Sequence, residues 1–224
     1  MKTPLVLISG LLSDKNLWKH QVEHLSDIAS IQVFSPSENS PEAMIKHILD
    51  ESPPTFALAG HSMGGWLSLE MMRVAPSRVT KLCLLNTTSR RDSDKKRIQR
   101  EKMIQMAEQG QFDKVIKKLL DHFVFQSSAK EQVEKMFLAV GKEAFIRQEQ
   151  SMMKRRELTS LLPTIACKTL VIHAAEDKNF SLKEHQELAK QIPKAYLAII
   201  EDSGHMSPME MPEAVTDLLR LWLK

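Results

Sequence analysis

Short apolar segments rich in Val, Ile and Leu recur along the chain and alternate with stretches whose apolar residues have helical spacing. Continuous apolar runs of this length are typical of parallel strands that are buried on both faces. Their alternation with helical stretches is typical of an α/β fold. The pattern therefore predicts a mostly parallel sheet of about six strands flanked by helices. The predicted strands cover residues 5–8, 31–34, 56–59, 81–85, 169–172 and 196–200.

One interval, residues 89–160, departs from this alternation, because it has helical periodicity and no convincing strand. Open α/β sheets bind their ligands at the carboxyl ends of the strands. We therefore interpret residues 89–160 as a helical lid inserted over that edge, and residues 1–88 and 161–224 as the core. The alternative is that the interval is further packed helix. Two apolar stripes show the helical spacing: Val115, Ile116, Leu119, Leu120 and Phe123, then Val133, Met136, Phe137 and Val140.

Composition excludes several classes of protein. With 224 residues, 42% of them hydrophobic, the chain can bury one sizeable core. A formal net charge of +3 is far from the basicity of a dedicated nucleic-acid binder, and no apolar run approaches the ~18 residues of a membrane span. Cys83 and Cys167 support neither a disulfide framework nor a zinc site. Residues 5–12 resemble a short signal peptide but lack a small-residue cleavage site, so a cytoplasmic protein is expected.

The pentapeptide Gly60-His61-Ser62-Met63-Gly64 is the clearest chemical motif. It follows a predicted strand directly and precedes a helical run that Pro76 is expected to end. This is the context of the G-x-S-x-G nucleophile elbow, in which a sharp turn holds the central serine in a strained conformation. Glycines flank the serine because a side chain there would crowd the turn. Ser62 is therefore the predicted nucleophile, with an ordinary helix cap as the alternative.

A serine hydroxyl is a weak nucleophile, so a base must lie within hydrogen-bond reach of it. His205 follows the last predicted strand, at the same carboxyl edge of the sheet as the elbow, and is the predicted base. His61 lies within the elbow, and His173 ends a strand, where a role in the core is the alternative. The other histidines lie on helical patterns, for which a solvated face is expected: His20, His24, His47, His122 and His185.

A carboxylate must orient this base and stabilise its imidazolium form. Asp177 follows the strand predicted over residues 169–172, which produces the chain order serine, aspartate, histidine of the α/β-hydrolases. Glu176 and, further away, Asp92 are the alternatives. Asp202 is expected to shape the turn before the base.

Attack on a carbonyl creates an oxyanion, which needs preorganised hydrogen-bond donors. One donor is expected to be the backbone N–H of Met63, directly after the nucleophile. The other is expected from the loop after the first strand, residues 9–12, where we choose Leu11. The alternative for Gly10 in this loop is a glycine that merely ends the strand.

With these motifs, the chain resembles the α/β-hydrolase superfamily, close to the small serine carboxylesterases that include the pimeloyl-acyl-carrier-protein methyl esterases. The resemblance covers nearly the whole length. It departs from the family pattern at Ser9, where a His is common, at Leu12, where a Gly is common, and in starting almost at the first parallel strand without an N-terminal hairpin. Besides the elbow, it rests on residues 9–10, 18–21, 75–79, 168–172, 204–205 and 210–213.

The expected reaction is hydrolysis of a carboxylic ester or thioester through an acyl-enzyme on Ser62. Two alternatives stay open: a carbon–carbon lyase or hydrolase with the same triad, and a small-molecule receptor or signalling protein that retains it. No grouping of His, Cys, Asp or Glu has the spacing of a metal site, and no Gly-rich phosphate loop is present. We therefore expect neither a metal nor a nucleotide cofactor.

The predicted lid is basic, with 17 Lys or Arg against 11 Asp or Glu between residues 90 and 157. Such charge on amphipathic helices usually marks a solvated surface. The other interpretation is that it attracts an acidic carrier of the acyl group, such as acyl carrier protein or coenzyme A. The residues concerned are Arg90, Arg91, Lys95, Lys96, Arg97 and Arg100.

Overall fold

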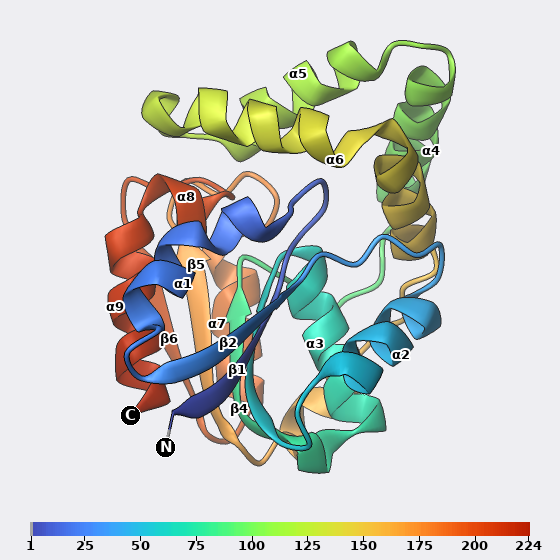
Figure 1. Ribbon diagram of the computed structural model, residues 1–224. Helices are drawn as coiled ribbons and strands as arrows, with labels where there is room; N and C mark the ends of the chain where they lie inside the picture. The colour runs from blue at the N-terminus through green and yellow to red at the C-terminus, as the bar shows by residue number, and fades with distance from the viewer. Residues whose placement is uncertain (1) are drawn as a thin grey trace.

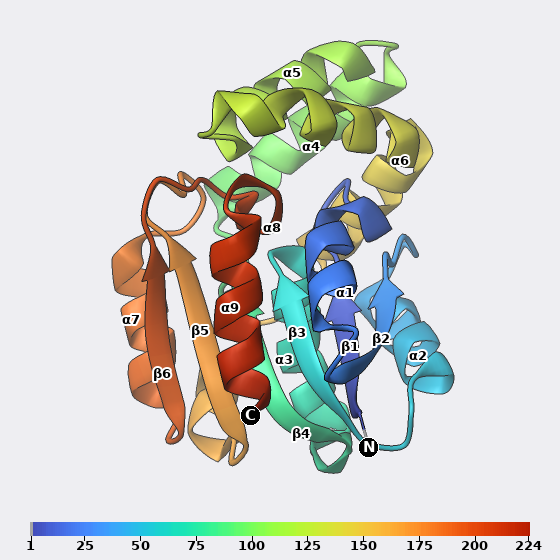
Figure 2. The same ribbon diagram turned by 60° about the vertical axis from the view of Figure 1, so that its left-hand side comes forward.

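The computed structural model describes residues 2–224, and within that part of the chain six strands form one sheet of order β2-β1-β3-β4-β5-β6. Every neighbouring pair is parallel, so the predicted α/β fold is confirmed (Figures 1 and 2). All six predicted strands are present, with ends that differ from the prediction by at most two residues. They are β1 (Thr3–Ile8), β2 (Ala29–Phe34), β3 (Phe56–His61), β4 (Val79–Leu85), β5 (Lys168–Ala174) and β6 (Ala195–Ile200).

Helices cover both faces of this sheet (Figure 2). Alternate residues of a strand point to opposite faces, so each strand contributes to two cores. In β1, Leu5 and Leu7 pack in the core that contains Trp222, whereas Val6 and Ile8 pack in the core that contains Trp66. The first face is covered by α1 (Lys19–Leu25) and α9 (Pro212–Leu223), the second by α2 (Pro41–Glu51), α3 (Met63–Val74) and α7 (Leu182–Gln191).

Local signals set the ends of these helices. The side chain of Ser40 accepts a hydrogen bond from the Ala43 N–H and caps α2. Ser181 and Glu184 form a reciprocal capping box at the start of α7. Helix α3 starts at the elbow and ends two residues before Pro76, as predicted. The short elements are η1 (Lys15–Trp18), η2 (Pro76–Arg78), η3 (Thr159–Thr164) and α8 (Ser207–Glu210).

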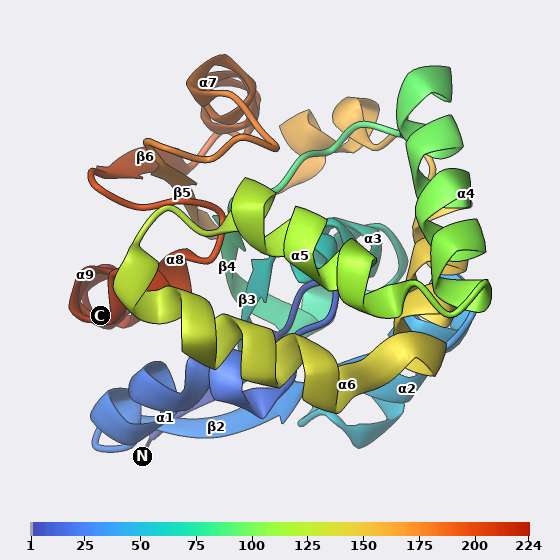
Figure 3. The same ribbon diagram turned by 90° about the horizontal axis from the view of Figure 1, so that it is seen from above.

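The predicted lid, residues 89–160, contains the helices α4 (Asp94–Glu108), α5 (Phe112–Phe123) and α6 (Ser127–Met153). Figures 1 and 3 show α5 and α6 lying across the carboxyl edge of the sheet, with α4 beside them. The predicted stripe of α5 is buried along its whole length. Helix α6 is interrupted at Gly141, whose φ of 84° lies outside helical values and favours glycine. This placement puts the predicted lid over the strand ends.

None of the helices within residues 2–224 combines the length and the apolarity that crossing a membrane requires.

Candidate active site

Ser62 lies at the tight turn between β3 and α3, with φ 55° and ψ −114°. A positive φ is strained for a residue with a side chain and persists only where the surroundings impose it. The end of β4 does so here. The Ser62 N–H donates to the Leu85 carbonyl at 2.9 Å, and the Thr87 hydroxyl donates to the Ser62 carbonyl at 2.6 Å. The strained geometry expected of a nucleophile elbow is therefore present.

The two glycines of the elbow have no room for a side chain. A Cβ at Gly60 would lie 2.2 Å from the Gly64 carbonyl oxygen, and a Cβ at Gly64 would lie 2.3 Å from the carbonyl oxygen of Ile8. Both contacts are with backbone, which cannot move aside without distorting the sheet. The crowding predicted from the motif is thus a property of how α3 packs against β1.

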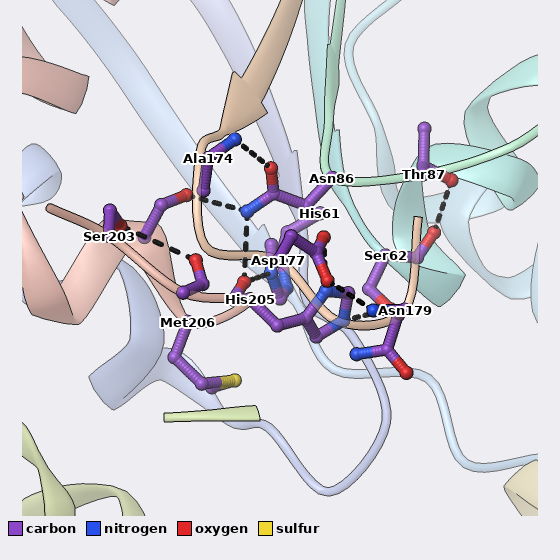
Figure 4. A network of polar contacts seen from close by, with 12 residues as sticks. His61, Ser62, Asn86, Thr87, Ala174, Asp177, Asn179, Ser203, His205 and Met206 are labelled. Atoms are coloured by element: carbon purple, nitrogen blue, oxygen red, sulfur yellow. Dashed lines mark hydrogen bonds and ion pairs between the residues drawn. The ribbon is translucent and has the colours of Figure 1, made fainter. Parts of the chain in front are cut away.

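His205 connects the serine to the carboxylate (Figure 4). The Ser62 hydroxyl donates to His205 Nε2 at 2.8 Å, and His205 Nδ1–H donates to Asp177 Oδ2 at 2.9 Å. A carboxylate can only accept, so it selects the tautomer that leaves Nε2 free to take the serine proton. The His205 N–H donates to the Phe123 carbonyl at 2.8 Å, which ties the loop after β6 to α5.

Asp177 is the carboxylate that faces the imidazole. Its side chain is fully buried, and its Oδ1 accepts the Asn179 N–H at 2.7 Å. Burial opposes the charge, but the His205 ring and the Asn179 N–H outweigh it and hold the pKa of the Asp177 carboxyl below its usual value. The alternatives are elsewhere: Glu176 is exposed, and Asp92 is engaged by arginines.

The two expected oxyanion donors lie on the same cavity as the serine. Leu11 and Met63 both line it, and Met63 is the first residue of α3, where backbone N–H groups have no partner inside the helix. Neither the Leu11 N–H nor the Met63 N–H donates a hydrogen bond to another group within residues 2–224. The neighbouring N–H of Leu12 is by contrast occupied, because it donates to Gln148 Oε1 at 2.9 Å.

Asn86, which the sequence reasoning missed, joins the strand ends behind the site (Figure 4). Its side-chain amide donates to the His205 carbonyl and to the Ser207 hydroxyl, both at 3.0 Å, and accepts the Ala174 N–H at 2.9 Å. Its φ is 44°, a conformation that Asn tolerates better than most residues. An Asn directly after an apolar strand was the available signal.

Glu210 is a second missed residue. Its carboxylate accepts the backbone N–H of Gly204 at 3.2 Å and of Met206 at 3.0 Å, on either side of the base. It also accepts the N–H groups of Phe125 at 2.7 Å and Gln126 at 2.8 Å, from the segment between α5 and α6. One buried carboxylate therefore fixes both the histidine loop and the helices above it. Its role depends on tertiary contacts that the sequence does not display.

The other histidines fall into several environments. His61 is buried and its Nε2–H donates to the His205 carbonyl at 2.7 Å. Burial, aided by the nearby His205 ring, lowers the pKa of His61 to about 3, so it stays neutral. The expected solvated face is wrong for His185, which is fully buried, with Nε2 accepting the Thr87 N–H at 3.2 Å. His122 is exposed and also lines the cavity.

The cavity in front of Ser62 has a volume of about 500 Å³. Its floor holds Ser62 and His205 from the strand ends, and much of its remaining lining comes from α4, α5 and the end of α6. Large apolar side chains line the cavity as well: Met103, Met106, Leu119, Phe123, Met152 and Phe180.

Charged side chains occupy part of the same wall. Arg100 Nε donates to Asp92 at 2.6 Å, while its Nη1 donates to Glu149. Arg155 Nη2 also donates to Asp92. Lys96 lines the cavity beside them. Neither interpretation of the basic lid residues, as a solvated face or as a surface that attracts a carrier, describes Arg100 and Lys96, because the fold turns both toward the interior.

Comparisons with known proteins agree with this fold. The sequence model of the Alpha/beta hydrolase family matches residues 7–218. A curated hydrolase of Acinetobacter baylyi, (E)-2-((N-methylformamido)methylene)succinate hydrolase, is 25% identical and aligns with 99% of this chain and 90% of its own. A thermophilic esterase of Thermogutta terrifontis, solved with malate bound, is 27% identical with a TM-score of 0.90, covering 100% of this chain and 90% of that one.

An enol-lactonase of Burkholderia xenovorans LB400 has a TM-score of 0.88 over 100% of this chain and 92% of its own. At 20% identity it shows the shared fold alone. The chain therefore belongs to the alpha/beta hydrolase family, and the family and its relatives support a hydrolase. The narrower resemblance to pimeloyl-acyl-carrier-protein methyl esterases stays a prediction.

Proposed function

We propose that the protein is a serine hydrolase that cleaves a carboxylic ester or thioester, with Ser62 as nucleophile, His205 as general base and Asp177 as its orienting carboxylate. The observation that supports this most strongly is the unbroken hydrogen-bond chain from the Ser62 hydroxyl through the imidazole to the buried carboxylate. It opens on a cavity large enough for a small acyl group.

The steps follow from these positions. The Ser62 oxygen bonds to the substrate carbonyl carbon while its proton passes to His205 Nε2, and the carbonyl electron pair moves onto oxygen. In our proposal, the N–H groups of Leu11 and Met63 bind that oxyanion. Collapse breaks the bond to the leaving alcohol or thiol, which takes the proton from Nε2. A water then attacks the acyl group with the same base, releasing the acid and restoring the serine.

The names of two relatives are compatible with this reaction. The Acinetobacter protein is by name a hydrolase of a succinate derivative, and the Thermogutta protein is by name an esterase. A carbon–carbon hydrolase or lyase would use the same three residues, so the distinction depends on substrates.

Residues 89–160 remain the proposed lid. The cytoplasm remains the proposed location, because both cysteines are unpaired.

An acidic acyl carrier remains a proposed partner only for the cations that are exposed and form no ion pair within residues 2–224. These are Arg91, Lys95 and Arg97; Arg90 is also exposed, but it pairs with Glu187. Attraction between exposed charges weakens with salt, because the Debye length falls from about 10 Å at 0.1 M to about 3 Å at 1 M. Reversing these three charges should therefore slow only an acyl-carrier or coenzyme A thioester, and mostly at low salt.

The test of the reaction combines labelling with turnover. A fluorophosphonate should label each chain once, on Ser62, and the protein should hydrolyse esters or thioesters in a panel graded by acyl length. An adduct on another residue would contradict the assignment of the nucleophile. Labelling of Ser62 without turnover of any ester or thioester would instead favour carbon–carbon chemistry or a receptor.

A further inference from the structure

The helical wall of the cavity holds more positive than negative charge. Arg100 is neutralised by two carboxylates, Asp92 and Glu149, and Arg155 shares the first of them. The Lys96 ammonium forms no ion pair or hydrogen bond with any residue in the described range 2–224, whereas the Lys96 backbone N–H donates to Ser93 Oγ. In the cluster of Lys96, Arg100 and Arg155, three cations therefore face two carboxylates. Lys102 and Lys118 also line the cavity and add to the positive charge of this wall.

The donors of this cluster are incompletely satisfied. The Arg155 side chain is only 5% exposed, and its Nε has no hydrogen-bond partner within residues 2–224. The Lys96 ammonium lies 4.7 Å from the centroid of the Phe180 ring, a cation–π contact that offsets part of its lost hydration. Burial, together with Arg155 and Arg100, lowers the pKa of Lys96 to about 8. Unpaired buried charge is costly, so an anion bound here would be stabilised.

This charge lies close to the reaction centre. The Lys96 ammonium contacts the Phe180 ring. The centroid of this ring lies 5.8 Å from the centroid of the His205 ring. The ammonium is thus one aromatic ring away from the proposed base, within the same cavity. Besides Asp92, Glu184 acts on Lys96, and Glu184 is already engaged by Ser181 in the capping box of α7.

We propose that the cavity binds a substrate with a free carboxylate a few carbons away from the scissile carbonyl, and that Lys96 and Arg155 bind this carboxylate. The proposal rests on the ester or thioester hydrolysis proposed above and names its substrate class, the half-ester or half-thioester of a small dicarboxylic acid. The scissile carbonyl lies at Ser62, the chain crosses the apolar wall, and the carboxylate replaces the missing counter-ion of Lys96.

The size of the cavity limits the class of substrate. A cavity of about 500 Å³ holds a small diacid derivative rather than a nucleotide carrier.

The test compares monomethyl adipate with methyl hexanoate, which has a similar length and no carboxylate. The wild type should favour the half-ester in kcat/KM, and Lys96→Met should reduce that preference about tenfold to a hundredfold, the range for one charged hydrogen bond. Lys117→Met is the matched control, because Lys117 is exposed on α5 and lies outside the cavity. An unchanged preference in Lys96→Met, or an equal change in Lys117→Met, would overturn the proposal.

Calorimetric binding of the same two esters to Ser62→Ala separates this proposal from the reaction itself. A preference for monomethyl adipate that Lys96→Met abolishes supports the anion site even if the wild type hydrolyses neither ester. In that case only the proposed ester hydrolysis fails. Equal binding of both esters by Ser62→Ala overturns the anion site even if both are hydrolysed.

Discussion

The two walls of the cavity differ in how their side chains are held. The strand-end wall positions Ser62, His205 and Asp177 on short loops, with backbone hydrogen bonds and glycines that admit no Cβ. The helical wall is held by apolar stripes and by buried ion pairs around Asp92 and Arg100. The first wall leaves little freedom at the reacting atoms. The second is joined mostly through side chains, which makes it the place where substrate preference can be altered without disturbing the triad.

Removing the proposed nucleophile of the strand-end wall is expected to have the largest effect on turnover. Ser62→Ala should reduce turnover by about 10⁶, because loss of a triad nucleophile leaves only the oxyanion site and binding. The thermal unfolding midpoint should change little, since alanine keeps the Cβ and loses only the hydrogen bond to His205 Nε2. Residual ester hydrolysis close to the wild-type rate would show that the strand-end wall does not carry the chemistry.

Substitution of the proposed orienting carboxylate, Asp177, is expected to have the next largest effect on kcat. Asp177→Asn should reduce kcat by about 10⁴, because an amide in place of the carboxylate favours the wrong imidazole tautomer. Glu176→Gln changes the neighbouring exposed carboxylate in the same loop and should leave kcat nearly unchanged. Steady-state kinetics on one good ester measures both. A larger loss for Glu176→Gln would reassign the orienting carboxylate.

Stability should distinguish the ion pairs of the helical wall from those on the surface. Asp92→Asn leaves Arg155 and Arg100 short of a buried counter-charge and should lower the free energy of unfolding by about 3–5 kcal/mol. Asp121→Asn breaks an exposed pair with Lys130 and should have no measurable effect. Urea unfolding followed by circular dichroism compares the two. Equal stability of both variants would mean that packing alone holds this wall.

The smallest expected effect is a pH dependence of substrate preference. The pKa of Lys96, about 8, means that its cation is present below that pH and is lost above it. The groups that act on it are Arg155, Arg100, Asp92 and Glu184. The ratio of kcat/KM for monomethyl adipate to that for methyl hexanoate should therefore fall as the pH rises through about 8.

Lys96→Arg provides the control, because a guanidinium stays charged throughout this range. In this variant, the ratio of kcat/KM for the two esters should not change with pH. A fall in the ratio that persists in Lys96→Arg would assign the titration to another group.

The strands and the strained turn at Ser62, the proposed nucleophile, were predictable from the sequence because their signals are local. An apolar run marks a strand buried on both faces, and Gly60 to Gly64 directly after such a run marks the elbow. His205 and Asp177 were predictable from their places after strands, since the carboxyl ends of parallel strands meet at one edge. The choice of Asp177 over Glu176 rested on the pattern of the family, and only the contact with His205 Nδ1 distinguishes their geometry.

The helical wall was decided by the tertiary structure. The sequence showed a basic helix, and nothing in its spacing distinguishes Arg100 or Lys96, which face the cavity, from Lys95, which faces solvent. Their direction depends on how α4 packs against α6 and on carboxylates far away in the chain, such as Glu149. His185 and Glu210 are buried for the same reason. Helical periodicity reports an apolar face, whereas a buried charge is set by partners that only folding brings together.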